Sequence, residues 1–220
     1  MYRRLAILIV IVAATVAATA LADNEVYVGR KTAAMTELDR IDHSAWNALL
    51  KKYVDDNGMV DYAAWHGNTS DMKALDTYLN TLSAGDVRKA TGNGRLAFWI
   101  NSYNAVTIRG ILREFPTASI RNHTARVFGY NIWKHLQLYV GGVPYSLEGI
   151  EHQILRKTND PRIHFAIVCA SVGCPRLLNE AYTPAKVQQQ LENNAVDFFG
   201  RKQNFRHDVA GKRFDLSRVL

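Results

Sequence analysis

The amino-acid sequence predicts an α+β fold in which helices pack on a mostly antiparallel sheet. Three observations predict it. Apolar residues recur at helical spacing in several segments, of which residues 95–115 form the strongest. Residues 132–140 and 163–170 have the apolar patterns of strands. Gly141-Gly142 permits a tight hairpin turn after the first strand, which indicates antiparallel pairing.

The first third of the folded part is expected to be mainly helical. Residues 44–54 place their apolar side chains on one side of a helix. A turn at residues 55–58 and a short strand at 59–62 should follow. Ser70 has the position of an N-cap for a second helix, and residues 82–92 are expected to form a loop or a frayed helix.

The helix predicted over residues 95–115 should be mostly buried, because its apolar residues surround the cylinder, and Pro116 should end it. Asn101 and Asn104 lie inside this apolar run and, at a spacing of three, share a face. A buried amide without partners costs about 1–3 kcal/mol. We therefore expect polar groups from elsewhere in the chain to meet this helix at Asn101 and Asn104.

The second half of the sequence is expected to alternate between strands and helices. Residues 143–145 complete the hairpin, and Ser146 has the position of an N-cap for a helix over residues 147–156. Asp160-Pro161 breaks the chain. The nearly all-apolar segment 163–170 then predicts a central strand, followed by a loop at 171–175.

The C-terminal part of the sequence predicts one more helix and a hairpin. Thr183-Pro184 should open the helix and Gly200 should close it. Residues 204–209 and 213–216 have the pattern of a second hairpin.

The N-terminus has the pattern of a cleavable signal peptide. Arg3 and Arg4 form a cationic start, and residues 5–20 form an apolar run without charge. Ala20-Leu21-Ala22 places small residues at the two positions that a signal peptidase reads. The apolar run is shorter than the about 20 residues of a membrane-spanning helix, although an uncleaved anchor is the alternative.

The expected organisation is a signal peptide at residues 1–22, a tether at 23–43 and a single globular domain at 44–220. A periplasmic or secreted location follows, with no stable membrane span after the leader is cleaved. The net charge is +7, but the basic residues are scattered rather than clustered, so we expect no nucleic-acid partner. The partner is instead an unidentified substrate or a component of the cell envelope.

Residue types suited to thiol chemistry occur close together in the second half of the sequence. Glu148, Glu151 and His152 lie on one predicted helix, where Glu148 and His152 share a face. Cys169 lies near the far end of the predicted central strand. An imidazole can take the proton of a thiol, and a carboxylate can orient that imidazole, so these residue types suit a nucleophilic cysteine.

Structural roles account for the same residues. Cys169 and Cys174 are disulfide candidates in an oxidising compartment. His164 in an apolar strand suits a core histidine, and Glu148 with His152 suits a surface pair worth about 0.3–0.5 kcal/mol. A zinc site would draw on His152, His164, Cys169 and Cys174, but the compact ligand spacing is missing. We expect no metal and no cofactor, because no phosphate loop or tandem metal motif is present.

Three motifs, in order, resemble the domain-of-unknown-function family 547 (DUF547). They are Phe98-Trp99-Ile100-Asn101-Ser102-Tyr103-Asn104-Ala105, then Tyr145-Ser146-Leu147 with Ile150-Glu151-His152-Gln153-Ile154-Leu155-Arg156, then Asp160-Pro161-Arg162-Ile163-His164-Phe165-Ala166 with Cys169. The resemblance runs from about Tyr62 to Leu216. It implies a cysteine, a Glu-His pair and two helical asparagines at characteristic positions, and kinship with papain-like or transglutaminase-like thiol enzymes.

Carried over to this sequence, the resemblance implies Cys169 as nucleophile, His152 as general base and Glu151 as orienting carboxylate. Asn101 would orient the site or donate to an oxyanion, with Asn104 as a further polar support. Glu148, His164 and Cys174 are supporting candidates, of which Cys174 is the less regular cysteine of the family pattern. Family members continue past this C-terminus, so the sequence is expected to be truncated.

Two hypotheses on function follow. The first is a thiol-dependent hydrolase or acyl transferase that acts on an amide or ester bond. The second is a noncatalytic periplasmic binding or scaffold module in which Cys169 and Cys174 form a disulfide.

Overall fold

A computed structural model describes residues 25–88, 92–125, 129–169, 174–208 and 210–217. The signal peptide expected at residues 1–22 therefore lies outside the described residues. Within the described ranges, none of the helices combines the length and the apolar character that crossing a bilayer requires.

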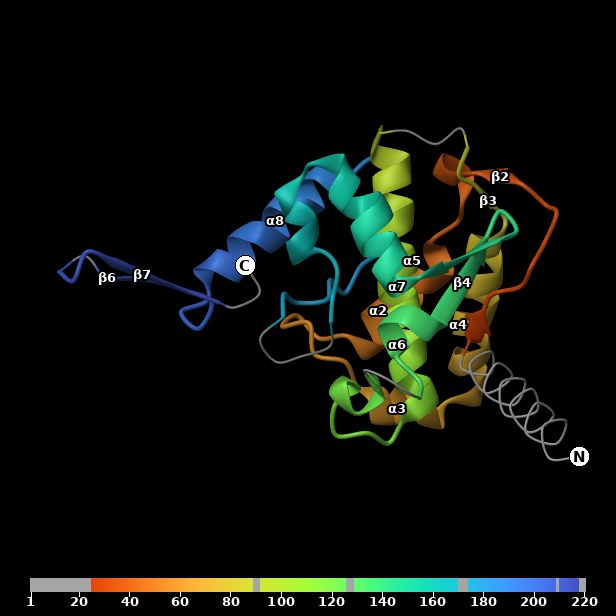
Figure 1. The fold of residues 1–220 in the computed structure, drawn as a ribbon, viewed down its shortest axis with the longest axis horizontal. Helices are drawn as coiled ribbons and strands as arrows, with labels where there is room; N and C mark the ends of the chain where they lie inside the picture. The colour runs from red at the N-terminus through yellow and green to blue at the C-terminus, as the bar shows by residue number, and fades with distance from the viewer. Residues whose placement is uncertain (1–24, 89–91, 126–128, 170–173, 209, 218–220) are drawn as a thin grey trace, which may run out of the picture.

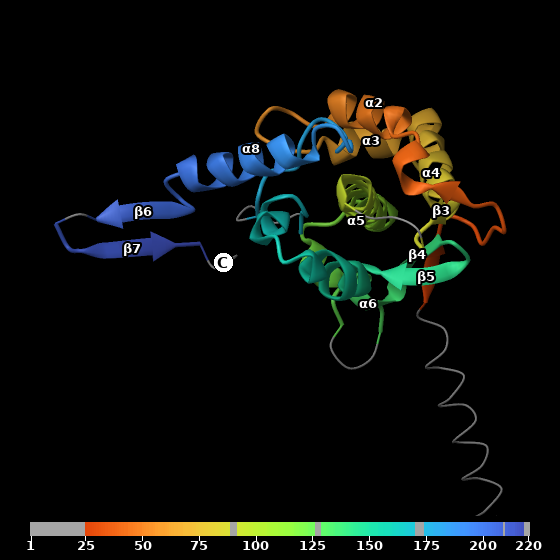
Figure 2. The ribbon, with the colours of Figure 1, turned by 90° about the horizontal axis from the view of Figure 1, so that it is seen from above.

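Helix α5 (Gly92–Glu114) is the centre of the fold. Figures 1 and 2 show α5 between a layer of three helices and a layer that contains a small sheet. The three helices are α2 (Ser44–Tyr53), α3 (Tyr62–Gly67) and α4 (Thr69–Ser83). Burial from both sides explains why apolar residues surround α5, as the sequence predicts.

The sheet has three strands in the order β1-β4-β5, and it is mixed. Strand β4 (Leu136–Val140) pairs antiparallel with β5 (Val143–Ser146) across the predicted Gly141-Gly142 turn. On its other edge, β4 pairs in parallel with β1 (Val26–Val28). The structure is thus broadly α+β, as predicted, but the expectation of a mostly antiparallel sheet is wrong.

Residues expected to form a tether contribute to this fold. Beyond β1, they form β2 (Thr36–Glu37), which pairs in parallel with β3 (Gly85–Asp86), and a short 3-10 helix, η1 (Leu38–Arg40). Leu38 is 2% exposed and belongs to the hydrophobic core. Parts of the segment 25–43 therefore belong to the folded body.

Two predicted strands begin as short helices. Residues 132–135 form α6 (Ile132–His135), because the side chain of Asn131 caps a helical turn by accepting from the Trp133 backbone N–H. The central strand predicted at 163–170 is absent from residues 163–169, which begin in the 3-10 helix η5 (Pro161–Phe165) and continue as irregular backbone. Asp160 caps η5 through the Arg162 N–H, with Pro161 at its first position.

Other elements differ from the predictions in smaller ways. The strand predicted at 59–62 is an isolated bridge between Val54 and Val60, after which α3 begins at Tyr62. The helix predicted at 147–156 is divided into α7 (Leu147–Gly149), a π-helix η3 (Ile150–Leu155) and a 3-10 turn η4 (Arg156–Thr158). A further 3-10 turn, η2 (Ile120–His123), follows α5.

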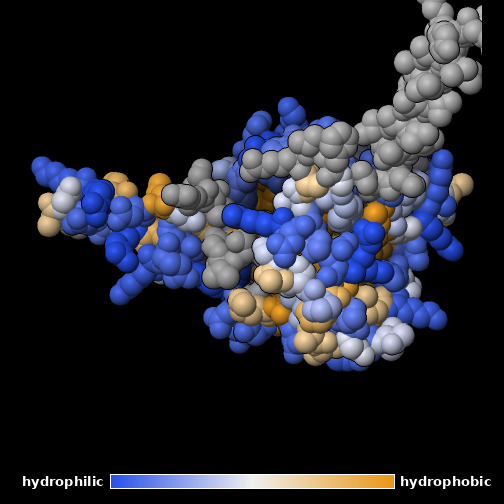
Figure 3. All heavy atoms as spheres, turned by 60° about the horizontal axis from the view of Figure 1, so that its bottom comes forward, coloured by the Kyte–Doolittle hydropathy of each residue, from blue (hydrophilic) through white to orange (hydrophobic). Residues whose placement is uncertain are grey.

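The C-terminal elements are α8 (Val187–Gly200) and the hairpin of β6 (Phe205–Asp208) and β7 (Arg213–Leu216). The predicted hairpin is confirmed. Figures 1 and 2 show that it projects from the end of α8, away from the rest of the molecule. Apolar side chains appear on this arm among hydrophilic ones (Figure 3), and Phe214 is 61% exposed.

Candidate functional site

A pocket of about 330 Å³ lies beside α5, and because most of its lining residues are polar or charged we call it the polar pocket. Four of its lining residues are candidates from the sequence, namely Glu148, Glu151, His152 and Cys169. The pocket is completed by Tyr103, Asn131, Trp133 and Lys134. The fold thus brings a cysteine, an imidazole and two carboxylates from separate segments of the chain to the wall of one pocket.

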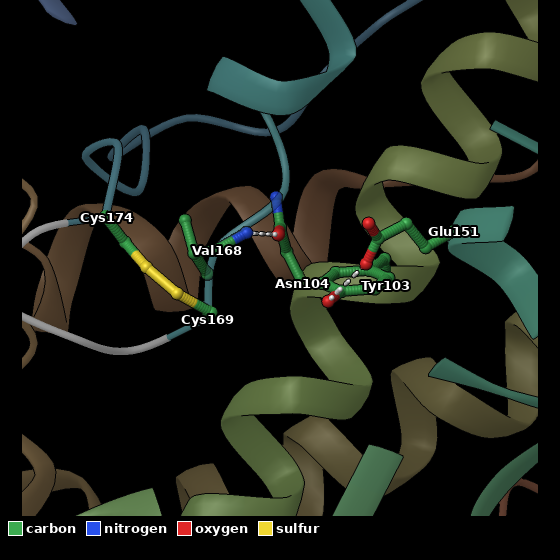
Figure 4. Close-up of a disulfide and its surroundings, with 6 residues drawn as sticks. All are labelled: Tyr103, Asn104, Glu151, Val168, Cys169 and Cys174. Atoms are coloured by element: carbon green, nitrogen blue, oxygen red, sulfur yellow. Dashed lines mark hydrogen bonds between the residues drawn. A yellow bond between two sulfur atoms is a disulfide. The ribbon is translucent and has the colours of Figure 1, made fainter. Parts of the chain in front are cut away.

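Asn104 holds the backbone that carries Cys169. Its side-chain nitrogen donates to the carbonyl oxygen of Ala166 at 2.9 Å, and its side-chain oxygen accepts from the N–H of Val168 at 3.1 Å. Figure 4 shows this contact next to the bond between Cys169 and Cys174. Because Asn104 is buried in a rigid helix, it fixes the irregular segment immediately before Cys169.

Asn101 makes the same pair of bonds to a different segment. Its side chain donates to the carbonyl of Tyr182 at 2.7 Å and accepts from the Tyr182 N–H at 3.0 Å. The polar partners predicted for both asparagines are therefore confirmed. The role expected for Asn101 as an oxyanion donor is not supported, because its amide is already committed to Tyr182.

The π-helix η3 carries Glu151 and His152 into the polar pocket. Ser146 caps the preceding turn by accepting from the N–H of Gly149 at 3.1 Å, and the backbone widens into the π-helical form at Ile150. A π-helical turn contains more residues than an α-helical one, and such turns are frequent at functional sites. The widening lies between Glu148 and His152, which both still line the pocket.

Glu151 contacts a buried tyrosine and an arginine. The hydroxyl of Tyr103 donates to Glu151 Oε2 at 3.5 Å, the outer limit of a hydrogen bond, as Figure 4 shows. Burial, and secondly the charge of Glu151, raises the pKa of the Tyr103 hydroxyl, so this group remains a donor. On the other oxygen, Glu151 Oε1 lies 3.6 Å from Arg156 Nε. Glu151 is thereby oriented while its side chain stays partly exposed.

His164 lies near the polar pocket without lining it. It borders a separate shallow cavity with Arg156 and Asp160. Burial lowers the pKa of His164, and the charge of Arg156 lowers it further, while Glu151 has the opposite effect. The strand-core position expected for His164 is wrong, because η5 places this residue at a half-buried surface site.

Cys169 and Cys174 form a disulfide, with their Cα atoms 6.2 Å apart. The two cysteines border different spaces. Cys169 lines the polar pocket, whereas Cys174 lines a second pocket with Val168 and Leu177. In this oxidised form, the sulfur of Cys169 is bonded and cannot act as a nucleophile.

Comparison with known proteins identifies this chain at the level of its family. A family model described as "Protein of unknown function, DUF547" matches residues 87–199, just over half of the chain. The chain belongs to the DUF547 family. Comparisons with curated proteins and with solved structures find no match.

The DUF547 match spans every residue that lines the polar pocket, from Tyr103 to Cys169. It begins later than the resemblance noted from about Tyr62 and ends before Leu216. The pocket therefore belongs to the part of this protein that defines the family, while the β6–β7 hairpin follows that part.

Sequence reasoning did not select four residues of this DUF547 pocket, namely Tyr103, Asn131, Trp133 and Lys134. Tyr103 lies inside the first motif, between the two asparagines, which was an available signal. Asn131 caps α6, but because the sequence predicts a strand after this residue, its capping role was not expected. Lys134 and Trp133 lie on the same short helix, whose turn directs them to the pocket.

The structure does not support the zinc alternative for this DUF547 protein. Over the described ranges, no group of three or more His, Cys, Asp or Glu side chains is arranged to hold a metal ion. Two of the four ligands considered, Cys169 and Cys174, are bonded to each other instead.

Proposed function

We propose that this DUF547 protein is an exported thiol-dependent hydrolase or acyl transferase that acts on an amide or ester bond. Cys169 is the nucleophile, His152 the general base and Glu151 the carboxylate that orients the imidazole. A single observation carries the proposal, which is that these three residues line the same pocket. Kinship with papain-like or transglutaminase-like enzymes remains part of this hypothesis.

The reaction requires that the Cys169–Cys174 bond first be opened. A dithiol reductant supplies two electrons and two protons and leaves two thiols, as in ordinary thiol–disulfide exchange. His152 then takes the proton of Cys169, which produces the reactive thiolate. Glu151 supports the resulting imidazolium charge, and its contacts with Tyr103 and Arg156 hold it in place.

The thiolate attacks the carbonyl carbon of the substrate, so a carbon–sulfur bond forms and the carbonyl electrons move to oxygen. When the carbonyl re-forms, the amine or alcohol leaves and takes the proton from His152. Water or a second nucleophile then releases the acyl group from Cys169. The proton relay needs only the groups that line the polar pocket.

The proposed location is the periplasm or the extracellular space, on the strength of the N-terminal pattern. An oxidising compartment favours the disulfide form. The reduced enzyme would then be the active state and the oxidised form its resting state.

Thiol labelling tests the proposal. The Cys174→Ser variant is mildly reduced and then labelled with iodoacetamide at Cys169. The folded variant should react several times faster than the same variant after unfolding. The matched Cys169→Ser variant, in which only Cys174 remains, should show no such acceleration. His152→Ala should remove the acceleration at pH 7, because the base that forms the thiolate is lost. Equal rates for folded and unfolded Cys169 would refute the proposal.

The noncatalytic module is a second candidate, and the disulfide itself favours it. In that case, both cysteines are structural and the polar pocket binds an envelope partner. Reduction should then destabilise the fold, and neither thiol should react faster than in the unfolded chain. The labelling experiment separates this candidate from the first.

A further inference from the structure

We propose that a second, apolar pocket beside the disulfide binds an uncharged apolar group of the substrate, about the size of a benzyl group. This inference rests on the proposed function, because it assigns the pocket to the substrate of the same cysteine. It adds a substrate class, namely esters or amides with a ring-bearing or branched substituent close to the reacting carbonyl.

The size and lining of this pocket suit such a group. Its volume is about 220 Å³. An apolar cavity of about 150 Å³ is large enough to bind benzene. Apolar side chains make up much of its wall, among them Val60, Ile108, Val168 and Leu177. Met59 stands at the pocket with 63% of its surface exposed, where it can cover a bound group.

The position of the pocket connects it to the proposed nucleophile. Val168 lines the apolar pocket, and its neighbour Cys169 lines the polar one. Cys174, which is bonded to Cys169, also lines the apolar pocket. The disulfide, drawn in Figure 4, therefore joins one lining residue of each pocket. A substrate whose carbonyl reaches Cys169 needs only a short extension to place a substituent in the apolar pocket.

The charges at this pocket argue against a charged ligand. Arg176 and Arg201 both contribute to its lining, but both also face Asp197, with nitrogen–oxygen distances of 3.6 and 2.9 Å. Arg176 additionally donates to the backbone carbonyl of Asp56 at 3.1 Å. The donors of the two arginines are thus largely committed within the protein, and an anion would gain little from them.

Tyr62 lines the same pocket and carries a hydroxyl donor. Burial raises the pKa of its hydroxyl, so this group stays protonated. In the parts of the chain that the structure describes, the Tyr62 hydroxyl has no hydrogen-bond partner. A ligand with one acceptor oxygen beside its apolar group would complete this site, as an ester or amide does.

A binding experiment tests the pocket without any catalysis. Benzyl alcohol is titrated into the oxidised, ¹⁵N-labelled protein, with benzoate as the charged control. Shifts of the backbone signals should concentrate at Val60, Tyr62 and Val168, and benzoate should bind more weakly. Val60→Phe should fill the pocket and weaken binding about tenfold or more, since one buried apolar group changes binding by about 10- to 100-fold.

The matched variant Val143→Phe separates a filled pocket from a general disturbance. It makes the same substitution at a residue of β5 that is 50% exposed and lies outside the pocket lining, so the fold and the benzyl alcohol affinity should persist, whereas Val60→Phe loses the affinity. Melting curves of both variants verify that they are folded. Absence of shifts at the three pocket residues, or unchanged binding by folded Val60→Phe, overturns the inference.

The link to the substrate is tested on the reduced protein with p-nitrophenyl acetate and p-nitrophenyl phenylacetate. The phenylacetyl ester should have a kcat/KM about tenfold higher, and Val60→Phe should remove this preference while acetyl turnover persists. Turnover without a phenylacetyl preference overturns the inference alone. Benzyl alcohol binding with no Cys169-dependent turnover of either ester overturns the proposed function and leaves only the binding site.

Discussion

The side-chain oxygen of Asn104 accepts a hydrogen bond from the backbone N–H of Val168, 3.1 Å away, and so anchors the residue before Cys169 to the central helix. Asn104 also binds the carbonyl of Ala166, so its loss would leave two buried backbone groups unpaired. We expect Asn104→Ala to lower the free energy of unfolding by about 2–4 kcal/mol, measured by urea denaturation.

Asn101→Ala is the matched control for that variant, because Asn101 makes the same two bonds to Tyr182. Both variants should lose similar stability. Only Asn104→Ala should change the rate at which reduced Cys169 reacts with iodoacetamide, since only Asn104 holds the segment before it. Equal effects of the two variants on that rate would contradict a positioning role for Asn104.

The disulfide should contribute measurably to stability. It closes a short loop between residues five apart in the sequence, and constraining the unfolded chain to such a loop is worth about 2 kcal/mol. Cys174→Ser should therefore lower the free energy of unfolding by about that amount, measured without reductant. Adding Cys169→Ser should cost little more, because the cross-link is already lost. Additive losses would show that the cysteines stabilise the fold by other contacts.

Stability should fall on the acid side of neutrality because of His43. This residue is buried, and its Nδ1 hydrogen-bonds with the hydroxyl of Tyr78 at 2.7 Å. Burial lowers the pKa of His43 from 6.5 to about 4, so between these values the unfolded chain binds a proton that the folded chain does not.

The contribution of His43 is therefore complete above about pH 6.5 and is lost as the pH falls towards about 4, by an amount on the order of 3 kcal/mol. Denaturation at a series of pH values measures this loss. His43→Gln should reduce the slope over this range, whereas the exposed-residue variant His207→Gln should leave it unchanged. A slope that persists in His43→Gln would assign the effect to other groups.

Two phenylalanines should differ sharply in their effect on stability. Phe198 on α8 is 1% exposed, and Phe214 on the β6–β7 hairpin is 61% exposed. Phe198→Ala should cost about 3–5 kcal/mol, as buried aromatic truncations do, while Phe214→Ala should change stability by about 0.5 kcal/mol or less. Thermal melting of both variants measures the difference. A large loss of stability in Phe214→Ala would mean that the β6–β7 hairpin packs against other parts of the protein in solution.

The sequence predicts the buried helix and its polar partners well, because both depend on a strong local signal. Asn101 and Asn104 stand out in an apolar run, and the cost of an unpaired amide requires a partner. The polar pocket was predictable only as a set of residue types. No spacing in the sequence indicates that the segment with Cys169 returns to the segment with His152.

Errors arose where a local pattern fits two structures. An apolar segment such as 163–170 suits a buried strand and a buried irregular segment equally, and the cap at Asp160 decides for η5. Strand β1 was missed because Val26–Val28 lies in a polar stretch and pairs with Leu136–Leu138, far away in the sequence. That pairing also changes the sheet from antiparallel to mixed.

The two asparagines of α5 have a consequence for how the chain reaches its native state. Their partners lie 62 to 81 residues further along the sequence, so a large loop must close before either amide is satisfied. Contacts this distant in sequence slow folding relative to local helical ones. We therefore expect the walls of both pockets to be assembled after the α2–α4 layer has formed, in the last step of the folding reaction.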